Sequence, residues 1–170
     1  MSMEFHVHLN VISDDIIPAI IDELNKFEMA CEVHPDFLFS TQSGFLPFKF
    51  RLSEPRLAIL KDKDLMTGFE LYIEDFDPEE ADWFSPEDLT RLKQFHKTVT
   101  IRFSAFDSFQ LRFADLTSAV IAKLTGGPRS FDEDVVYDTA TIVDDAWEGI
   151  KNWENSIADA DWRYHEFDGW

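Results

Sequence analysis

An alternation of apolar and polar residues predicts a β-strand at the start of the chain. Between residues 3 and 11 every odd position is apolar and every even position is polar. A period of two sends successive side chains to opposite faces of a sheet, so we expect one buried face and one polar face. The same alternation predicts strands over residues 68–74 and 97–103 and a short strand near 134–137, and residues 31–61 look extended.

Apolar residues spaced three and four positions apart predict three helices, over about residues 14–30, 107–124 and 141–155. A fourth helix is expected from Ser85 to about His96. Serine followed by proline and two acidic residues is typical of a helix N-terminus, because serine caps the free N–H groups and proline fits the first turn.

Together these elements predict one domain over residues 1–170, of the α+β class. The sheet is expected to be mixed or antiparallel with helices on one face, in the ferredoxin-like style. Two strand–helix units, at 3–30 and 97–124, stand on either side of a strand-rich middle. The chain ends in an acidic and aromatic segment, residues 158–170.

Composition narrows the function classes. The chain has 170 residues, one cysteine and a formal net charge of −19. One cysteine permits neither an internal disulfide nor a thiolate zinc cluster. The charge argues against direct binding of nucleic acid, which needs Lys and Arg to neutralise phosphates. The N-terminus does not resemble a signal peptide, and no apolar run approaches the roughly 18 residues of a membrane helix, so we expect a cytoplasmic protein without membrane partners.

The negative charge is gathered in two segments. Residues 70–88 hold nine acidic side chains and no Lys or Arg, and residues 132–170 hold twelve against Lys151 and Arg163. Clustered charge of one sign destabilises a fold through self-repulsion. Two interpretations stay open: the charge serves only solubility, or it forms a docking surface for a basic partner.

Aromatic residues lie within both acidic segments and favour the docking interpretation. Tight interfaces place aromatic anchors inside a polar rim, whereas a merely solvating tail has few aromatic residues. We therefore expect one exposed surface that binds a basic protein. Its expected members are Asp75, Asp77, Glu79, Glu80, Asp82, Trp83, Asp159, Asp161, Trp162 and Trp170.

A small acidic chain with aromatic anchors resembles the immunity proteins that neutralise bacterial antagonistic toxins. The resemblance lies in size, charge and aromatic content over the whole chain, and no short motif carries it. Many of those toxins are nucleases with basic clefts. The resemblance implies a non-enzymatic bacterial inhibitor that binds its toxin stoichiometrically and covers the active site.

Histidine motifs provide an enzymatic alternative. The run from His96 to Val99 resembles one half of the two-histidine phosphoesterase signature, in which each His is a general acid or base and each Thr or Ser holds the phosphate. The other half is the run that begins at His6, where His8 replaces the hydroxyl residue. This alternative uses His6, His96 and Thr98, and it requires both imidazoles to face one cleft.

Metal sites and cofactors are not expected. His6 and His8 lie about 7 Å apart along one strand, a spacing that suits a shared metal, but no third ligand is placed by sequence, and we interpret them as solvent-facing. The run 75–79 begins like a calcium loop, yet Glu80 replaces its required glycine and Pro86 its final glutamate. The sequence also has no phosphate-loop or dinucleotide-binding motif.

Overall fold

The computed structural model describes residues 1–104 and 106–170, and it shows an α+β fold with an antiparallel sheet. Its strands are β1 (Met3–Leu9), β2 (Met29–Val33), β3 (Gly44–Leu52), β4 (Leu65–Asp75), β5 (Lys97–Phe103), β6 (Arg129–Phe131), β7 (Asp134–Val136) and β8 (His165–Glu166). Its helices are α1 (Ile17–Leu24), α2 (Pro86–Leu92), α3 (Gln110–Thr125) and α4 (Ile142–Ser156), with short 3-10 turns at Asp14–Ile16, Ala58–Leu60 and Asp159–Asp161. The predicted fold class is confirmed.

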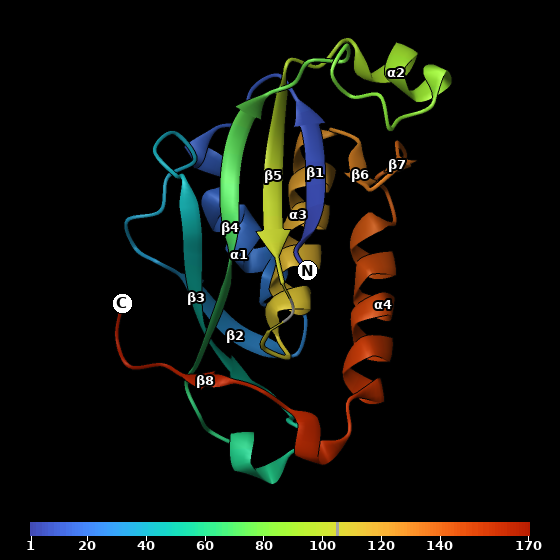
Figure 1. Cartoon of the computed structure of the whole chain (residues 1–170). Helices are drawn as coiled ribbons and strands as arrows, with labels where there is room; N and C mark the ends of the chain where they lie inside the picture. The colour runs from blue at the N-terminus through green and yellow to red at the C-terminus, as the bar shows by residue number, and fades with distance from the viewer. Residues whose placement is uncertain (105) are drawn as a thin grey trace.

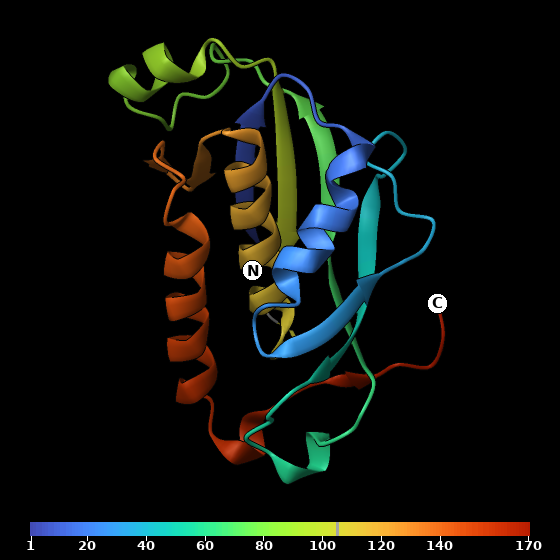
Figure 2. The same ribbon diagram turned by 180° about the vertical axis from the view of Figure 1, so that it is seen from behind.

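The strands run in the order β2-β3-β4-β5-β1-β6-β7, and β8 adds to the first residues of β4. Strand β1 lies between β5 and β6 and is antiparallel to both. The connection from β5 through α3 to β6 therefore straddles β1, which is the split arrangement of ferredoxin-like folds. Figures 1 and 2 show α1 and α3 side by side on one face of the sheet, with α4 alongside α3.

The predicted alternation decides which face the helices cover. Phe5, Val7 and Leu9 of β1 are buried in the core, together with odd-numbered apolar residues of β4 and β5: Leu65, Phe69, Leu71, Val99, Ile101 and Phe103. Phenylalanine rings fill the space between the sheet and α3: Phe48 and Phe50 of β3 pack on Phe113 at centroid distances of 5.0 and 4.9 Å. Burying each such side chain contributes about 1.5–3 kcal/mol. The even-numbered residues of β1, β4 and β5 consequently lie on the other face, which the helices leave open.

The first helix is shorter than predicted, because a side chain reverses the chain early. The expected helix over 14–30 ends at Leu24, and Met29 already begins β2. The Asn25 amide oxygen accepts a hydrogen bond from the Cys31 backbone N–H at 2.6 Å, which fixes the reversal. Strand β1 likewise ends at Leu9, so Val11, predicted on the buried face, is 81% exposed.

The predicted Ser85 cap begins α2, which ends at Leu92 rather than near His96, and two glycines after α3 help to position β1. The Ser85 hydroxyl accepts a hydrogen bond from the Asp88 N–H at the start of α2, and Gly126 adopts φ 73° at the end of α3. The next residue, Gly127, lies so close to β1 that a Cβ there would meet the His8 carbonyl oxygen at 2.3 Å. The His8 N–H then donates to the Pro128 carbonyl at 2.9 Å. Only glycine allows this approach, which fixes His8 against β6.

Candidate functional site

Polar side chains of three neighbouring strands meet on the open face of the sheet. In the register of β1 and β5, His6 pairs with Thr100 and His8 with Thr98. Strand β4 places Glu74 opposite Thr98 on the other side of β5. Since all five residues occupy even positions, the period of two sends every side chain to the same face. Cross-strand pairs of this kind bring polar groups within hydrogen-bonding reach.

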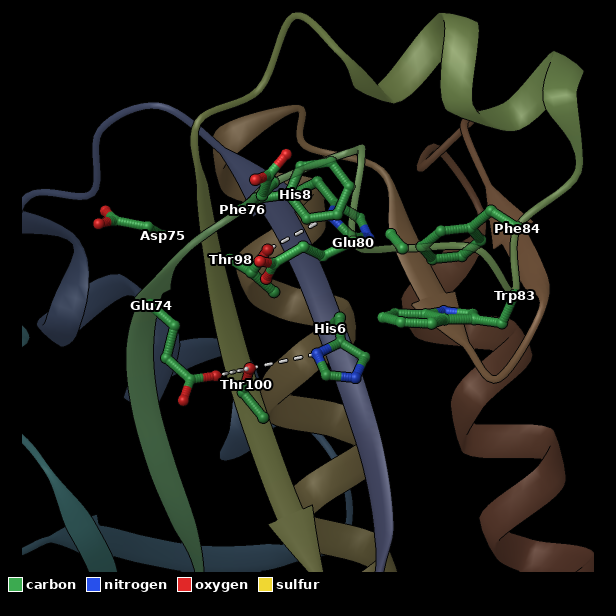
Figure 3. Close-up of a pocket in the computed structure, with 12 residues that line it drawn as sticks. His6, His8, Glu74, Asp75, Phe76, Glu80, Trp83, Phe84, Thr98 and Thr100 are labelled. Atoms are coloured by element: carbon green, nitrogen blue, oxygen red, sulfur yellow. Dashed lines mark hydrogen bonds between the residues drawn. The ribbon is translucent and has the colours of Figure 1, made fainter.

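Hydrogen bonds join these side chains into two short networks. The Thr100 hydroxyl donates to Glu74 Oε2 at 3.1 Å and lies 3.2 Å from His6 Nδ1 (Figure 3). Further along the strands, His8 Nδ1 lies 3.5 Å from the Thr98 hydroxyl, and its Nε2 lies 2.9 Å from the Ser130 hydroxyl of β6. The strands therefore fix the orientation of both imidazoles.

A loop covers one end of this polar face and creates a pocket. We call residues 76–85, which join β4 to α2, the acidic loop. Phe76 of the loop packs on the His8 ring at a centroid distance of 4.9 Å, and Phe84 packs on it at 5.8 Å. The pocket is partly open to solvent and has a volume of about 160 Å³. It is lined by His6, His8, Glu74, Asp75, Phe76, Asp77, Glu80, Ala81, Trp83, Phe84, Thr98 and Thr100 (Figure 3).

The acidic loop is folded rather than merely solvated. Ala81, Phe84 and Leu92 form a small core of their own beside the main core, and Phe95 and Tyr137 pack against it. The Phe76 N–H donates to the carbonyl of His96 at 2.9 Å, and a turn closes between Asp77 and Glu80. Because Ala81 and Phe84 are buried, the loop is held in place and its carboxylates are exposed at a fixed position.

Burial favours the neutral form of the two histidines of the pocket. His8 is only 2% exposed, and burial, reinforced by the neighbouring His6, lowers its pKa to about 4. Burial also lowers the pKa of His6 below its ordinary value, although Glu4 and Glu74 oppose this shift. The interpretation of both residues as solvent-facing is therefore wrong for His8, because the acidic loop lies over it. The charge of the pocket at pH 7 comes from its carboxylates.

The structure brings together six of the ten residues predicted to bind a partner. Asp75, Asp77, Glu80 and Trp83 line the pocket. Glu79 and Asp82 are exposed on the same loop. Trp83 is 54% exposed and stands beside Phe84 at a centroid distance of 5.4 Å. These six residues form one surface patch, which we call the acidic patch.

The remaining predicted residues lie away from the acidic patch, and Asp159, Asp161 and Trp162 lie toward the other end of the molecule. Asp159 and Asp161 belong to the turn before β8, and β8 pairs with Leu65 and Met66 at the start of β4, whereas the acidic loop follows its end. Ten residues of strand separate the two ends by about 33 Å. Figures 1 and 2 show this separation, with α2 beyond one end of the sheet and β8 near the other. The expectation of one continuous surface is therefore wrong.

Of the two C-terminal tryptophans predicted to be exposed, Trp170 is exposed and Trp162 is not. Trp162 is partly buried against the main core, where it packs on Phe109 at 5.3 Å, and the Arg56 guanidinium lies 5.2 Å from its ring. Trp170 is 46% exposed and packs on His34 and Phe167. Apolar contact holds Trp162 in the fold, so it cannot serve as a free anchor.

The phosphoesterase alternative needs two histidines in one cleft, and the structure does not bring them together. His96 is exposed and precedes β5, four residues from Thr100, the cross-strand partner of His6. That distance along a strand is about 13 Å. His96 does not line the pocket that holds His6, although Thr98 does. One phosphate group does not span this separation.

Sequence reasoning missed several residues of the pocket: Phe76, Phe84 and Ala81 of the loop, together with Glu74 and Thr100. The alternation that placed His6 and His8 on the polar face also applied to Glu74 and Thr100, and it was the available signal. Among residues 1–104 and 106–170, no group of three or more His, Cys, Asp or Glu side chains is placed to hold a metal ion.

Comparison with known proteins does not assign this chain to a family. Searches against protein-family models, curated proteins and solved structures found no match. Of the helices in the described part of the chain, none combines the length and apolar character required to cross a membrane. The function must therefore be argued from the geometry and charge of the site.

Proposed function

We propose that this protein is a non-enzymatic acidic binding protein that docks a basic protein partner on the acidic patch. The proposed setting is the bacterial cytoplasm, and the proposed role is that of an immunity protein that covers a basic toxin. The observation that carries the proposal is a half-exposed tryptophan, Trp83, on a folded loop that holds four acidic residues and no Lys or Arg.

Energetics favour a docking role for this patch over a purely solvating one. An indole exposed to water contributes little to the stability of the fold. It contributes to binding when a partner covers it, and tryptophan is among the residues most enriched at interface hot spots. Carboxylates around such an anchor raise the association rate of a basic partner and reject acidic ones. The small core beneath the loop holds these groups in place before binding, so little ordering entropy is lost.

Capture from lysate of the native host tests the proposal. The immobilised protein is expected to retain a basic protein at 50 mM NaCl and to release it at 500 mM, because salt screens exposed charges. The captured protein is then purified and titrated against two variants of equal net charge. Asp77→Asn/Glu79→Gln/Glu80→Gln alters the acidic patch, and Asp159→Asn/Asp161→Asn/Asp168→Asn alters the opposite end.

The dissociation constant is expected to rise at least about tenfold for the patch variant and to change less than about twofold for the control. Equal weakening of both variants would show that only net charge matters. Loss of binding in the control alone would move the interface to the C-terminal segment. Either result contradicts docking on the acidic patch.

A further inference from the structure

We propose that the pocket beneath the acidic loop receives one arginine side chain of the partner. This inference rests on the proposed function, because it assumes that a basic protein docks on the acidic patch. It adds the chemical group that the pocket selects. The size of the pocket, its charge and its aromatic walls each favour an arginine side chain.

The size of the pocket suits a single small group. Its volume of about 160 Å³ is close to that of a cavity of about 150 Å³ that holds one benzene ring. Sites for drug-sized ligands or cofactors occupy about 300–1,000 Å³. The pocket therefore accommodates the end of one long side chain, whereas most of a nucleotide or a folded peptide would lie outside it.

The charge of the pocket selects a cation. Four acidic residues are among its lining residues, Glu74, Asp75, Asp77 and Glu80, and no Lys or Arg is. The Asp75 carboxylate points away from the pocket (Figure 3), so the other three carry its negative charge. Asp75 pairs with Lys97 on β5, and Glu74 accepts the Thr100 hydroxyl. Within the described ranges, Glu80 has neither an ion-pair partner nor a hydrogen bond to its carboxylate. A cation in the pocket gives Glu80 a partner and offsets the mutual repulsion of the group.

The aromatic walls favour a guanidinium over an ammonium ion. Trp83 and Phe84 lie on one side of the pocket, and Phe76 lies across it above His8 (Figure 3). A guanidinium is planar and weakly hydrated, so it stacks on rings and loses less on leaving water than the compact ammonium of lysine. Its fork of N–H donors then reaches the carboxylates at the rim.

The test uses three short peptides that differ in one side chain: acetyl-Ala-Arg-Ala-amide, its lysine analogue and its citrulline analogue. Citrulline has nearly the shape of arginine without the charge. Binding is measured by ¹H–¹⁵N chemical shifts, with the indole N–H of Trp83 as the main reporter. The arginine peptide is expected to give saturable shifts at Trp83 and Glu80, with binding at least about tenfold tighter than citrulline and about threefold tighter than lysine.

Matched variants separate the pocket from its surroundings. Trp83→Ala and Glu80→Gln are each expected to weaken the arginine peptide at least about threefold. Trp153→Ala and Glu148→Gln make the same chemical changes on α4, outside the pocket, and are expected to leave its binding unchanged. Thermal unfolding of each variant confirms that it is folded before it is titrated.

Two results would overturn the inference. Equal and non-saturable shifts from the arginine and lysine peptides would mean diffuse attraction to the acidic patch, which leaves the proposed function standing but removes the pocket. Equal binding of the citrulline peptide would remove selection for a cation. Failure of the proposed function itself is seen separately, in the capture experiment, when the patch variant keeps full affinity for the purified partner.

Discussion

Replacing Glu154 with glutamine is expected to lower the free energy of unfolding by about 3–5 kcal/mol, the largest effect predicted for this chain. Glu154 of α4 receives two hydrogen bonds from the Arg112 guanidinium of α3, at 2.9 and 2.8 Å, and the two side chains are only 9% and 7% exposed. Removing the carboxylate charge leaves a buried guanidinium without its counter-ion. Urea unfolding monitored by tryptophan fluorescence measures the change.

Two further variants test the cause of this loss. Lys151→Ala breaks an exposed ion pair on the same helix, between Lys151 and Glu148, and is expected to cost less than about 0.5 kcal/mol. Arg112→Met/Glu154→Leu replaces both buried charges by apolar groups and is expected to regain most of the stability lost in Glu154→Gln. A double variant less stable than Glu154→Gln would mean that shape, and not an unpaired charge, explains the effect.

Acid is expected to destabilise the fold through His8, by about 3 kcal/mol between pH 7 and pH 4. The pKa of His8 is lowered from 6.5 to about 4 in the folded state, mainly by burial. As the pH falls below 6.5, the His8 imidazole binds a proton in the unfolded chain but not in the folded chain, so the unfolded state is stabilised relative to the folded state. The full contribution is present above pH 6.5 and is lost by about pH 4.

Comparison of two variants isolates this contribution. His8→Gln loses contacts and is expected to be less stable at pH 7, but its free energy of unfolding should fall about 3 kcal/mol less by pH 4 than that of the wild type. His96→Gln, which changes an exposed histidine, controls for the loss of an imidazole as such. Burial raises the pKa of Asp107 and Asp115, so these two groups add stability as the pH falls. Their contribution is expected to be the same in the wild type and in both variants. Parallel pH profiles for wild type and His8→Gln would contradict the assignment.

Sequence patterns predicted the parts of the fold that depend on interactions between residues close together in the chain. Strand β5 lies at the predicted residues 97–103, and the Ser85 cap begins α2 where serine, proline and two acids indicated it. In both cases the deciding interactions lie within a few residues of each other, as periodicity and capping require. The face that carries His6 and His8 followed from the same reasoning.

The positions of the C-terminal segment and of the acidic loop depend on long-range packing, which the sequence pattern does not reveal. The C-terminal segment lies against the start of β4, where the two residues of β8 pair with Leu65 and Met66. In the same segment, Trp162 packs on Phe109. Nothing in the acidic composition of that segment indicates this contact. The acidic loop likewise folds over His8 because Phe76 and Phe84 pack on its ring, and that burial creates the pocket. Partners so distant in sequence are brought together only by the sheet.

The most direct test of docking on the acidic patch is a hydrogen-exchange footprint of the protein with its captured and purified basic partner. The comparison is made with and without the partner at the same pH and salt concentration. Slower exchange is predicted for backbone amides of residues 76–85 and the neighbouring ends of β4 and β5, with no change in residues 158–170. Protection confined to the C-terminal segment or to α4, with unchanged exchange in the acidic loop, would contradict the account.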